Sequence, residues 1–464
     1  MNTKQLRQKI LDLAIRGKLV PQDPNDESAA VLLERIRAEK EQLIKAGKIK
    51  RDKGDSAILR GDDKSHYAQL PQKWVWCKLG DIVELFSGQD LTPERYNDSG
   101  IGIPYITGAS CLENGRVIVN RWTDSPQVYS QCDDLLLTCK GAGIGKMAIS
   151  HLESAHIARQ IQALRAYTDI SIHYLQYVIS SNIQIIISQA NGLIPGIRRE
   201  IILDFAIPLP PIAEQRRITV AIESTFAVIN EIERNKSNLQ AAVTAAKSKI
   251  LSLAIRGKLV PQDPADEPAS VLLDRIRAER ESLVKQGKIK LAKSDSVIFR
   301  GDDNSYYVGL AESWAVCQLC EILDYEQPTQ YIVNTTDYRD EYKTPVLTAG
   351  KSFIIGYTQE QTGICSDLPV IIFDDFTTDS RYVDFPFKVK SSAMKILRTN
   401  WVDIKYLNHF MKTVECNHTT HKRYWISDYS QKYVALPPLA EQQRIVAAIE
   451  VAFEQLDSIT ATLV

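Results

Sequence analysis

The sequence repeats itself at long range, and this repetition restricts the possible folds more than any other feature of the chain. The segment ILDLAIRGKLVPQDP at residues 10–24 returns as ILSLAIRGKLVPQDP at residues 250–264. The segment LPPIAEQRRITVAIE at 209–223 returns as LPPLAEQQRIVAAIE at 436–450. The stretches between these segments differ far more from each other. Two variable blocks therefore alternate with near-identical framing segments.

The alternation divides the chain into five regions. We expect a repeated N-terminal helical region at residues 1–69 and a first variable domain at 70–209. A central repeated region with a long helix follows at 210–309, and a second variable domain at 310–436. The last region, 437–464, is a C-terminal helix that pairs with the central one.

The two variable blocks share one pattern of secondary structure. Each begins with a strand-like stretch after a tryptophan, Trp74 or Trp314, and continues through short β-branched or aromatic runs separated by Gly, Pro, Asn and Asp. Each ends with one helical segment, at about 172–190 and 402–414. The pattern predicts an α+β domain with a curled sheet, made twice.

The framing segments contain a heptad repeat. From Ile218 onward, apolar residues recur at alternating steps of four and three, which is typical of a coiled-coil seam. Pro210 and Pro211 suit the first turn of this helix and Gly257 suits its end, so a helix of roughly 45 residues would span about 65–70 Å. The predicted seam residues are Ile218, Ile222, Ile229, Ile232, Leu239, Val243, Ile250 and Leu253 in the central helix, and Ile445, Ile449, Leu456 and Ile459 in the C-terminal helix.

The two ends of the sequence complement each other. By the repeat, Val464 corresponds to residue 237 and Met1 corresponds to residue 241. We therefore expect the C-terminal and N-terminal segments to supply the two halves of a second helix, packed against the central one as a long antiparallel two-helix coiled coil. This circular repeat would separate the variable domains and relate them by a pseudo-two-fold axis. The antiparallel direction is an inference, because heptads alone do not fix it.

A short amphipathic helix is predicted between the coiled coil and each variable block, at about 29–46 and 269–286. We expect its apolar stripe to pack back onto the long helix. Docking of a partner protein is the alternative.

Composition and charge exclude several classes of protein. The formal net charge of −1 excludes DNA binding by bulk positive charge alone. Residues 71–208 carry 11 basic and 13 acidic side chains, and residues 311–436 carry 13 and 16, so a few well-placed side chains would have to make any DNA contact. The chain has no apolar run of about 18 residues and no secretory signal, and its eight cysteines are too sparse for a disulfide scaffold, so we expect a cytoplasmic protein.

Motifs that would indicate catalysis or metal binding fail on inspection. The stretch Lys140–Lys146 resembles a phosphate-binding loop, but Lys140 stands where that loop needs glycine and Met147 where it needs Ser or Thr. A tight glycine turn between two strands is the better prediction. Cys317 and Cys320 form a lone CxxC pair, and a second possible ligand group, Cys416, His418 and His421, has no counterpart in the first block. We find no methyltransferase or nuclease motif and expect the chain to be catalytically silent.

The framing segments carry a family resemblance. The doubled LPPIAEQRRI and LPPLAEQQRI, each following a variable block and opening a heptad helix, together with the doubled ILxLAIRGKLVPQDP, are similar to the specificity (S) subunits of type I restriction–modification systems. GIPYITGAS, DLLLTCKGAGIGKMAIS and GLIPGIRREIILDFAIPLPP resemble that family's target-recognition domains. The early stop at Val464 is one departure from the family pattern, which the N-terminal segment would complete.

The resemblance implies a function. Each variable block would be a target-recognition domain that reads one half of a bipartite double-stranded DNA site. The helical pair would set the spacing and dock two modification (M) subunits, which bring S-adenosylmethionine and methylate adenine. Restriction (R) subunits would add ATP- and magnesium-dependent translocation and cleavage. The chain itself would bind no cofactor and no metal.

Reading base edges directly requires Arg or Lys for guanine and Asn or Gln for adenine. The candidate DNA contacts are Lys140, Lys146, Arg159, Gln160, Arg198 and Arg199 in the first block, and Lys351, Arg381, Lys422, Arg423 and Tyr424 in the second. A purely solvating role for Arg198 and Arg199 stays open. Two other classes of function also remain: a coiled-coil scaffold whose variable domains bind proteins, and a self-sufficient DNA methyltransferase or nuclease.

Overall fold

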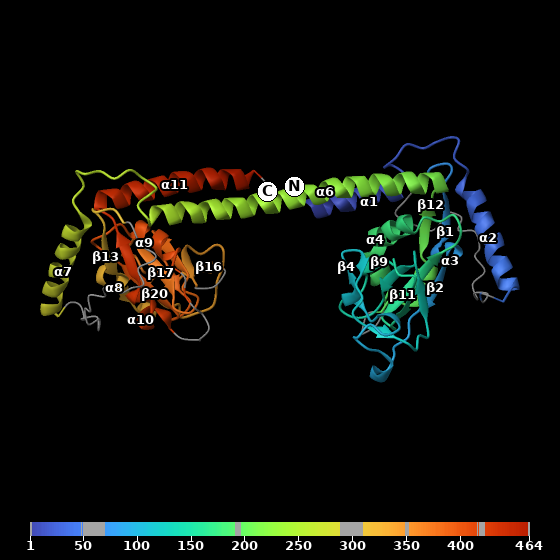
Figure 1. Cartoon of the computed structure of the whole chain (residues 1–464), viewed down its shortest axis with the longest axis horizontal. Helices are drawn as coiled ribbons and strands as arrows, with labels where there is room; N and C mark the ends of the chain where they lie inside the picture. Colours follow the sequence, from blue (N-terminus) through green and yellow to red (C-terminus); the bar gives the residue numbers. More distant parts are fainter. Residues whose placement is uncertain are drawn as a thin grey trace. The chain divides into compact units, whose positions relative to one another are not determined.

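The protein is described from a computed structural model. Its described residues are 2–47, 49, 70–190, 196–287, 310–348, 352–414, 416 and 423–462. They form two compact units, Met1–Asn235 and Lys236–Val464, and helix α6 (Ile212–Ala254) contributes residues to both (Figure 1). Both units combine helices with mostly antiparallel sheets, which confirms the predicted α+β class.

In unit 1, α1 and α2 precede the variable domain. The elements are α1 (Thr3–Ile15), α2 (Ala29–Lys45), β1 (Val75–Lys78), α3 (Leu79–Ile82), β2 (Val83–Ser87), β3 (Ile103–Ile106), β4 (Leu112–Glu113), β5 (Arg116–Val117), β6 (Trp122–Thr123), β7 (Tyr129–Gln131), β8 (Leu135–Thr138), β9 (Met147–Ile149), β10 (Ser154–Ile157), β11 (Ile161–Ala166), α4 (Ile172–Ser188), α5 (Arg199–Leu203) and β12 (Ala206–Leu209).

In unit 2 the same order returns with differences in strand length. The elements are α7 (Ala269–Lys285), β13 (Ala315–Gln318), α8 (Leu319–Ile322), β14 (Asp324–Glu326), β15 (Thr344–Leu347), β16 (Ile354–Thr358), β17 (Val370–Asp374), β18 (Ser380–Val383), β19 (Lys388–Val389), β20 (Met394–Arg398), α9 (Ile404–Met411), α10 (Tyr424–Ser427), β21 (Tyr433–Leu436) and α11 (Leu439–Ala461).

The variable domains share their sheet topology. The sheet β2-β11-β8-β9 of unit 1 corresponds to β14-β20-β17-β18 of unit 2, and in both sheets every pair is antiparallel. A second sheet in each domain contains one parallel pair, β3 with β10 and β15 with β19. The β-branched runs of the sequence fall on β3, β8, β9 and β11 and on β15, β16, β17 and β20, whereas β6, β7, β10, β18 and β19 were not predicted. The structure adds the pairing of all these strands.

Each variable domain begins and ends in one two-stranded ribbon. β1 pairs with β12, so that Val75 lies opposite Leu209, and β13 pairs with β21, so that Ala315 lies opposite Leu436. Because the first and last strands of each domain are neighbours, the chain leaves the domain where it entered. Such a block can vary internally without displacing the segments that frame it.

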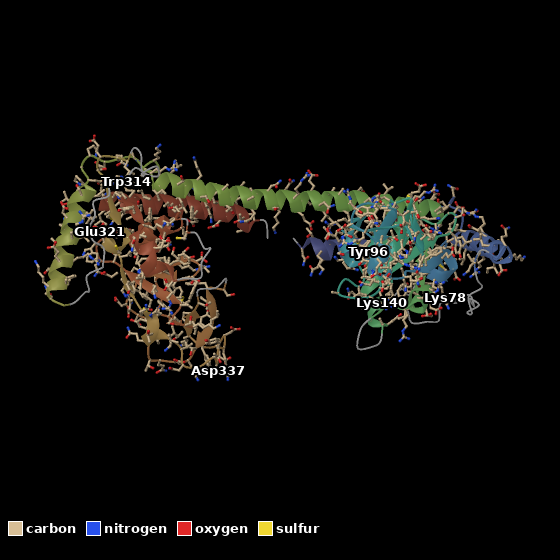
Figure 2. All side chains as sticks on the ribbon, turned by 60° about the horizontal axis from the view of Figure 1, so that its bottom comes forward. Lys78, Tyr96, Lys140, Trp314, Glu321 and Asp337 are labelled. Atoms are coloured by element: carbon tan, nitrogen blue, oxygen red, sulfur yellow. The ribbon has the colours of Figure 1, made fainter. Side chains whose placement is uncertain are left out.

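A buried tryptophan–glutamate pair fastens each ribbon to the following helix. Trp74 Nε1 donates to Glu214 at 2.9 Å, and Gln22 Nε2 donates to the other carboxylate oxygen at 2.5 Å. Trp314, labelled in Figure 2, donates to Glu441 at 3.0 Å, and Glu441 belongs to the first turn of α11. Burial raises the pKa of both carboxyl groups, and the bonds from the tryptophan and the glutamine lower it. The framing segments thus repeat in their contacts as well as in their sequence.

Unit 1 pairs α1 with α6 in an antiparallel direction. Arg7 donates to Glu233 at 3.0 Å, while Gln22, beyond the other end of α1, reaches Glu214 near the start of α6. In the core of this unit, Ile10, Leu11, Ala14 and Ile15 cluster with three predicted seam residues, Ile218, Ile222 and Ile229. Within unit 1, α1 and α6 therefore run in opposite directions.

Unit 2 pairs α11 with the later part of α6 in the same manner. Lys247 forms an ion pair with Asp457 at 2.5 Å, and Gln262, beyond the end of α6, donates to Glu441 at 2.6 Å. Ile445 and Ile449 are fully buried, and Val243 is buried. Leu239, Ile250, Leu253 and Leu456 are partly buried.

Two predicted seam residues are exceptions. Ile232 is 41% exposed and Ile459 is 43% exposed, and every residue from 231 to 238 is exposed. The heptad pattern continues through these positions, but an apolar residue is buried only where another helix lies against it. The prediction that Ile232 and Ile459 lie in a buried seam was therefore wrong for this structure.

The helices match their predicted bounds closely. α6 has 43 residues and begins after Pro210 and Pro211, which precede its first turn instead of occupying it. Gly257 follows its end with φ of 64°, a conformation that favours glycine.

The short amphipathic helices pack differently from the prediction. Lys40 of α2 donates to the Gly80 carbonyl oxygen at 2.9 Å, and Arg277 and Arg280 of α7 form ion pairs with Glu321 and Asp324. These contacts join each short helix to α3, or to α8 and β14, near the start of the adjacent variable domain. The predicted packing of the short helices onto the long helix is therefore not what these contacts show.

The buried carboxylates allow a test of the framing contacts. We expect Glu441→Ala to destabilise unit 2 by about 2–4 kcal/mol, because the buried Trp314 N–H and the Gln262 amide lose their acceptor. Glu214→Ala should do the same in unit 1. Arg275→Gln, which removes only an exposed ion pair with Glu267, should cost less than about 0.5 kcal/mol. Urea-dependent hydrogen exchange measures these values, on the β1 and β12 amides for unit 1 and on the β13 and β21 amides for unit 2. An Ala variant as stable as Arg275→Gln would contradict the assignment.

Candidate nucleic-acid interface

The predicted glycine turn joins β8 to β9. Thr138 N–H donates to the Lys146 carbonyl oxygen, and Gly145 N–H donates back to Thr138, both at 2.9 Å. Gly141 and Gly145 both have φ of 88°, in the left-handed region that favours glycine. The stretch that resembles a phosphate-binding loop is therefore a hairpin turn, as predicted.

Exposed cations flank this turn. Lys140 and Lys146 are exposed at its two ends, and the Lys146 ammonium group lies 3.5 Å from the Ala109 carbonyl oxygen. A Cβ atom on Gly143 would lie 2.1 Å from the Ala109 side chain, so only glycine allows the turn to approach residue 109 this closely. Figure 2 labels Lys140 within the first variable domain.

Gln160 lies in the middle of the same surface. Its backbone carbonyl oxygen accepts the Cys139 N–H at 2.7 Å, which ties the β10–β11 connection to the hairpin. Its amide oxygen would lie 3.0 Å from a Cβ atom on Gly108 and 3.5 Å from one on Gly141. Two glycines thus leave room around an exposed amide, the group that can bond two atoms of an adenine edge.

Arg159 is held by a carboxylate. Asp90 accepts from the Arg159 backbone N–H at 3.0 Å and from its guanidinium at 3.1 Å, and the Arg159 side chain is still 69% exposed. Sequence reasoning missed His156, which braces the loop that carries Asp90. The buried His156 ring bonds the Gln89 carbonyl oxygen at 3.0 Å and the backbone of Val128. Burial lowers the pKa of His156, which favours the neutral ring.

The two consecutive arginines have different surroundings. Ile197 N–H donates to the Cys139 carbonyl oxygen at 2.9 Å, so exposed Arg198 follows a segment that is attached to the hairpin turn. Arg199 donates to the Leu85 carbonyl oxygen at 2.6 Å and is only partly exposed. The structure therefore brings Arg198 to the same surface as Lys140 and gives Arg199 a bond within its own domain.

The second variable domain has the same framework with different side chains. Asp375 N–H donates to the Ala393 carbonyl oxygen, and Tyr424 N–H donates to the Asp375 carbonyl oxygen. These bonds correspond to those that Cys139 makes with Gln160 and Ile197. Ala393 consequently replaces Gln160, and exposed Phe376 replaces Lys140. Equivalent positions on the two domains thus present unlike chemistry.

The candidate contacts of the second domain have mixed outcomes. Arg381 is exposed on the edge strand β18, with its guanidinium 4.9 Å from the centre of the Phe353 ring. Arg423 is exposed at the start of α10. Tyr424 is only 1% exposed and belongs to the domain core, so in this structure it cannot reach a base, and its prediction as a DNA contact was wrong. Lys351 and Lys422 lie outside the described residues.

The possible metal ligands named from the sequence do not form a metal site among the described residues. Among the residues that the structure describes, no group of three His, Cys, Asp or Glu side chains could hold a metal ion. His418 and His421 lie outside that part of the chain. Cys317 and Cys320 are not joined in a disulfide, and burial raises the pKa of Cys317, so that its thiol stays protonated. In the described parts of the chain, no helix is both long enough and apolar enough to span a membrane.

Comparison with known proteins gives consistent matches. The family described as type I restriction modification DNA specificity domain matches residues 71–241. The specificity subunit of the type I restriction enzyme EcoAI from Escherichia coli is 31% identical over 388 residues, 69% of this chain and 62% of that subunit. The EcoR124I/EcoR124II specificity subunit, also from Escherichia coli, is 48% identical over 150 residues, 31% of this chain and 37% of that one.

A solved structure supports the fold. One chain from a study of complex assembly and conformational transition of the type I R-M system superposes with a TM-score of 0.59 at 16% identity, covering 85% of this chain and 94% of that chain. The match to the EcoAI subunit spans 62% of its length, less than two thirds.

Proposed function

We propose that this chain is a specificity subunit of a type I restriction–modification system, a non-catalytic DNA-recognition subunit; the match to the DNA specificity domain family and to the EcoAI specificity subunit supports this. Each variable domain binds one half of a bipartite site in double-stranded DNA. The subunit works in the cytoplasm as part of a larger complex.

The observation that carries this proposal is that the two variable domains share one framework but expose different side chains at equivalent positions. The Trp74–Glu214 and Trp314–Glu441 pairs and the sheet order recur, whereas Gln160 is replaced by Ala393. A protein that bound the same ligand twice would need the same contact residues twice. A protein that reads two different half-sites needs a constant scaffold and two different sets of base contacts.

The helices then have two roles. α6, with α1 and α11, is a spacer that holds the two variable domains at a fixed separation, because a stiff rod fixes the phase of two DNA contacts along a duplex. The N- and C-terminal helices complete an antiparallel coiled coil with α6, so that a pseudo-two-fold axis relates the domains. The same helices, repeated in sequence, dock two identical modification subunits.

The chemistry belongs to the partners in this proposal. Modification subunits supply S-adenosylmethionine and methylate adenine, which they must rotate out of the duplex to reach. Restriction subunits supply ATP- and magnesium-dependent translocation and cleavage. This chain contributes the sequence at which these reactions take place.

A coiled-coil scaffold for proteins remains the second candidate. It would also use a rod with two end domains, but it gives no reason for an exposed amide among cations. Turnover of S-adenosylmethionine by the purified chain alone would instead favour a self-sufficient methyltransferase.

A pair of variants in the first domain tests the proposal. In the assembled complex, Gln160→Ala should weaken discrimination at one base pair by about 1–3 kcal/mol, because the base loses its bidentate amide. Lys140→Gln should weaken binding of all duplexes similarly, because a phosphate contact carries no sequence information. Competition binding with duplexes changed at single positions separates the two effects. Equal losses on every duplex for Gln160→Ala would contradict its role in base recognition.

A further inference from the structure

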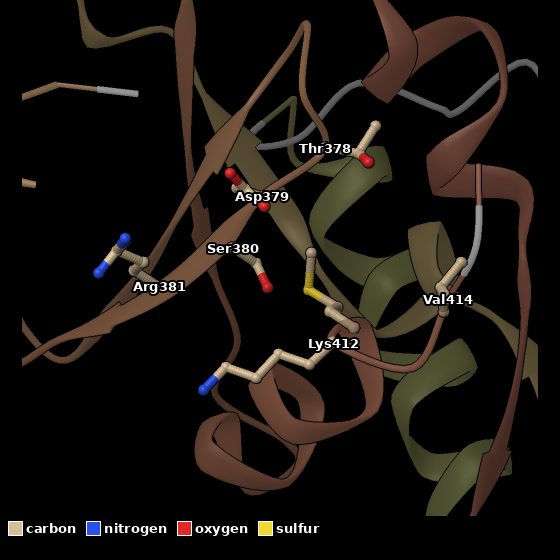
Figure 3. A pocket seen from close by; sticks show the side chains of 7 residues that line it. Thr378, Asp379, Ser380, Arg381, Lys412 and Val414 are labelled. Carbon is tan, nitrogen blue, oxygen red and sulfur yellow. The ribbon is translucent and has the colours of Figure 1, made fainter. Parts of the chain in front are cut away.

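Unit 2 contains a pocket whose lining includes one candidate DNA contact, Arg381, together with residues that the sequence did not single out. It lies between the edge strand β18 and the C-terminal end of α9 and has a volume of about 490 Å³. We call it the β18–α9 pocket. Its lining consists of Thr378, Asp379, Ser380, Arg381, Met411, Lys412 and Val414 (Figure 3).

The pocket contains an unused hydrogen-bond donor. Ser380 is only 8% exposed, and its hydroxyl group has no hydrogen-bond partner in the structure. Figure 3 shows this hydroxyl directed toward the end of α9 that carries Lys412, where its oxygen is almost fully covered, so a ligand bonds it only when a neighbouring side chain moves aside. Buried polar groups are nearly always paired, so an unpaired one that faces a pocket indicates a missing partner.

Two cations accompany this hydroxyl. Arg381 and Lys412 form no ion pair with any carboxylate in the described part of the chain, and Figure 3 shows their nitrogen atoms on the same side of the pocket. Partial desolvation lowers the pKa of Lys412, and the positive charges of Arg381 and Lys247 lower it further. The ring of Phe353 covers one face of the Arg381 guanidinium, which leaves the N–H groups at its edge able to donate.

The turn before β18 fixes these groups in place. Asp374 accepts from the Phe376 N–H and from the Thr377 hydroxyl, both at 2.8 Å, and its carbonyl oxygen accepts the Thr378 N–H. Ser380 then pairs with Phe373 in the antiparallel ladder. The donor is therefore positioned by secondary structure and does not depend on a flexible loop.

The first variable domain lacks this chemistry at the equivalent positions. By strand register, Ser380 and Arg381 correspond to Met147 and Ala148, which pair with Leu137 and Leu136. By the repeat that aligns Tyr406 with Tyr174, Lys412 corresponds to Ser180. Since the same fold forms in unit 1 with none of these groups, they are not required for folding.

We propose that the β18–α9 pocket binds a phosphodiester group of the DNA backbone beside the half-site that unit 2 reads; this inference rests on the proposed function. The Ser380 hydroxyl and the Arg381 and Lys412 side chains are the donors that an anionic phosphate oxygen accepts. Among the described lining residues Asp379 carries the one negative charge, so that Arg381, Lys412 and Asp379 together carry one net positive charge, which suits one phosphodiester. The contact positions unit 2 on the duplex and carries no sequence information.

The test uses the chain assembled with its modification subunits and fluorescent duplexes that carry either its own methylated sequence or a scrambled one. Lys412→Gln and Arg381→Gln should each weaken binding to both duplexes about 5–10-fold at 0.1 M salt and reduce the slope of log affinity against log salt by about one. Ser380→Ala should weaken binding about 2–5-fold with the slope unchanged. Lys285→Gln, at an exposed lysine in the last turn of α7, is the matched control and should behave as wild type.

Three other outcomes overturn the proposal. If Lys412→Gln matches wild type in affinity and salt slope while wild type still prefers its own sequence, the pocket does not bind DNA, although the proposed function stands. If inorganic phosphate raises the melting temperature of wild type but not of Lys412→Gln, with DNA binding unchanged, the pocket takes a free anion. If the wild-type complex does not distinguish the two duplexes, the proposed function fails and this inference fails with it.

Discussion

Replacing residues 70–209 with the corresponding block of another specificity subunit will change one half of the methylated DNA sequence completely and leave the other half unchanged. The physical basis is the ribbon of β1 and β12, where Val75 lies opposite Leu209. Because both ends of the block lie in this ribbon, junctions at Leu70 and Pro210 keep the two paired strands from the same parent. The contacts that the framing helices α1 and α6 make with each other are then unchanged.

Several contacts cross the junctions, and the buried bond from Trp74 is the one that the donor block must preserve. Trp74 belongs to the exchanged block, whereas its acceptor Glu214 belongs to the retained helix α6. A donor with tryptophan at this position should give a stable chimera, and a donor without it should lose stability as the Glu214→Ala variant does. Mapping of methylated adenines measures the result. The reciprocal exchange of residues 310–436 is the control, because it should change only the other half of the sequence; two unchanged halves in both chimeras would place recognition outside the variable domains.

Inserting seven residues into the exposed part of α6 should lengthen the gap between the half-sites by about three base pairs without changing either half-site. Seven residues add about 10.5 Å to a helix, and successive base pairs of DNA are about 3.4 Å apart. Residues 231–238 are the appropriate place, because all of them are exposed and an insertion there disrupts no buried contact. Seven residues make nearly two full turns, so the apolar positions on either side keep their phase.

An insertion of equal length but different stiffness provides the control. Seven helix-forming residues should give one new gap length, whereas seven glycine and serine residues should interrupt the rod and reduce methylation at every gap length. An unchanged gap with the helical insertion would show that α6 does not set the spacing.

The sequence predicted the parts of the fold that depend on local pattern. The long helix, the ends of α2 and α7 and the longer strands of the central sheets, such as β8, β11, β17 and β20, follow from periodicity, turn residues and the repeat. Ile218 and Ile232 show the limit of such reasoning. Both fit the heptad, but Ile218 is fully buried and Ile232 is 41% exposed. Burial requires a second helix alongside, and heptad spacing on one helix does not say how far its partner extends.

The candidate surface shows a similar limit. Lys140 and Lys146 are predicted from a recognisable glycine turn and Gln160 from the separate stretch HIARQIQ, and the structure brings Gln160 to that turn. Tyr424 is also a predicted contact, yet it is buried, because nothing in a short polar segment indicates which side chain enters the core. Ser380 was not found at all. A serine is common in strands, and only its missing hydrogen-bond partner distinguishes it.

The central claim is that two unlike domains on a repeated frame each recognise half of one DNA site. The most direct test is to express the chain with its modification subunits in a host that lacks adenine methylation and to map every methylated adenine in the genome. The account predicts one bipartite sequence with a constant number of unspecified base pairs between two different halves. A single uninterrupted sequence, or two halves at variable separation, would contradict it.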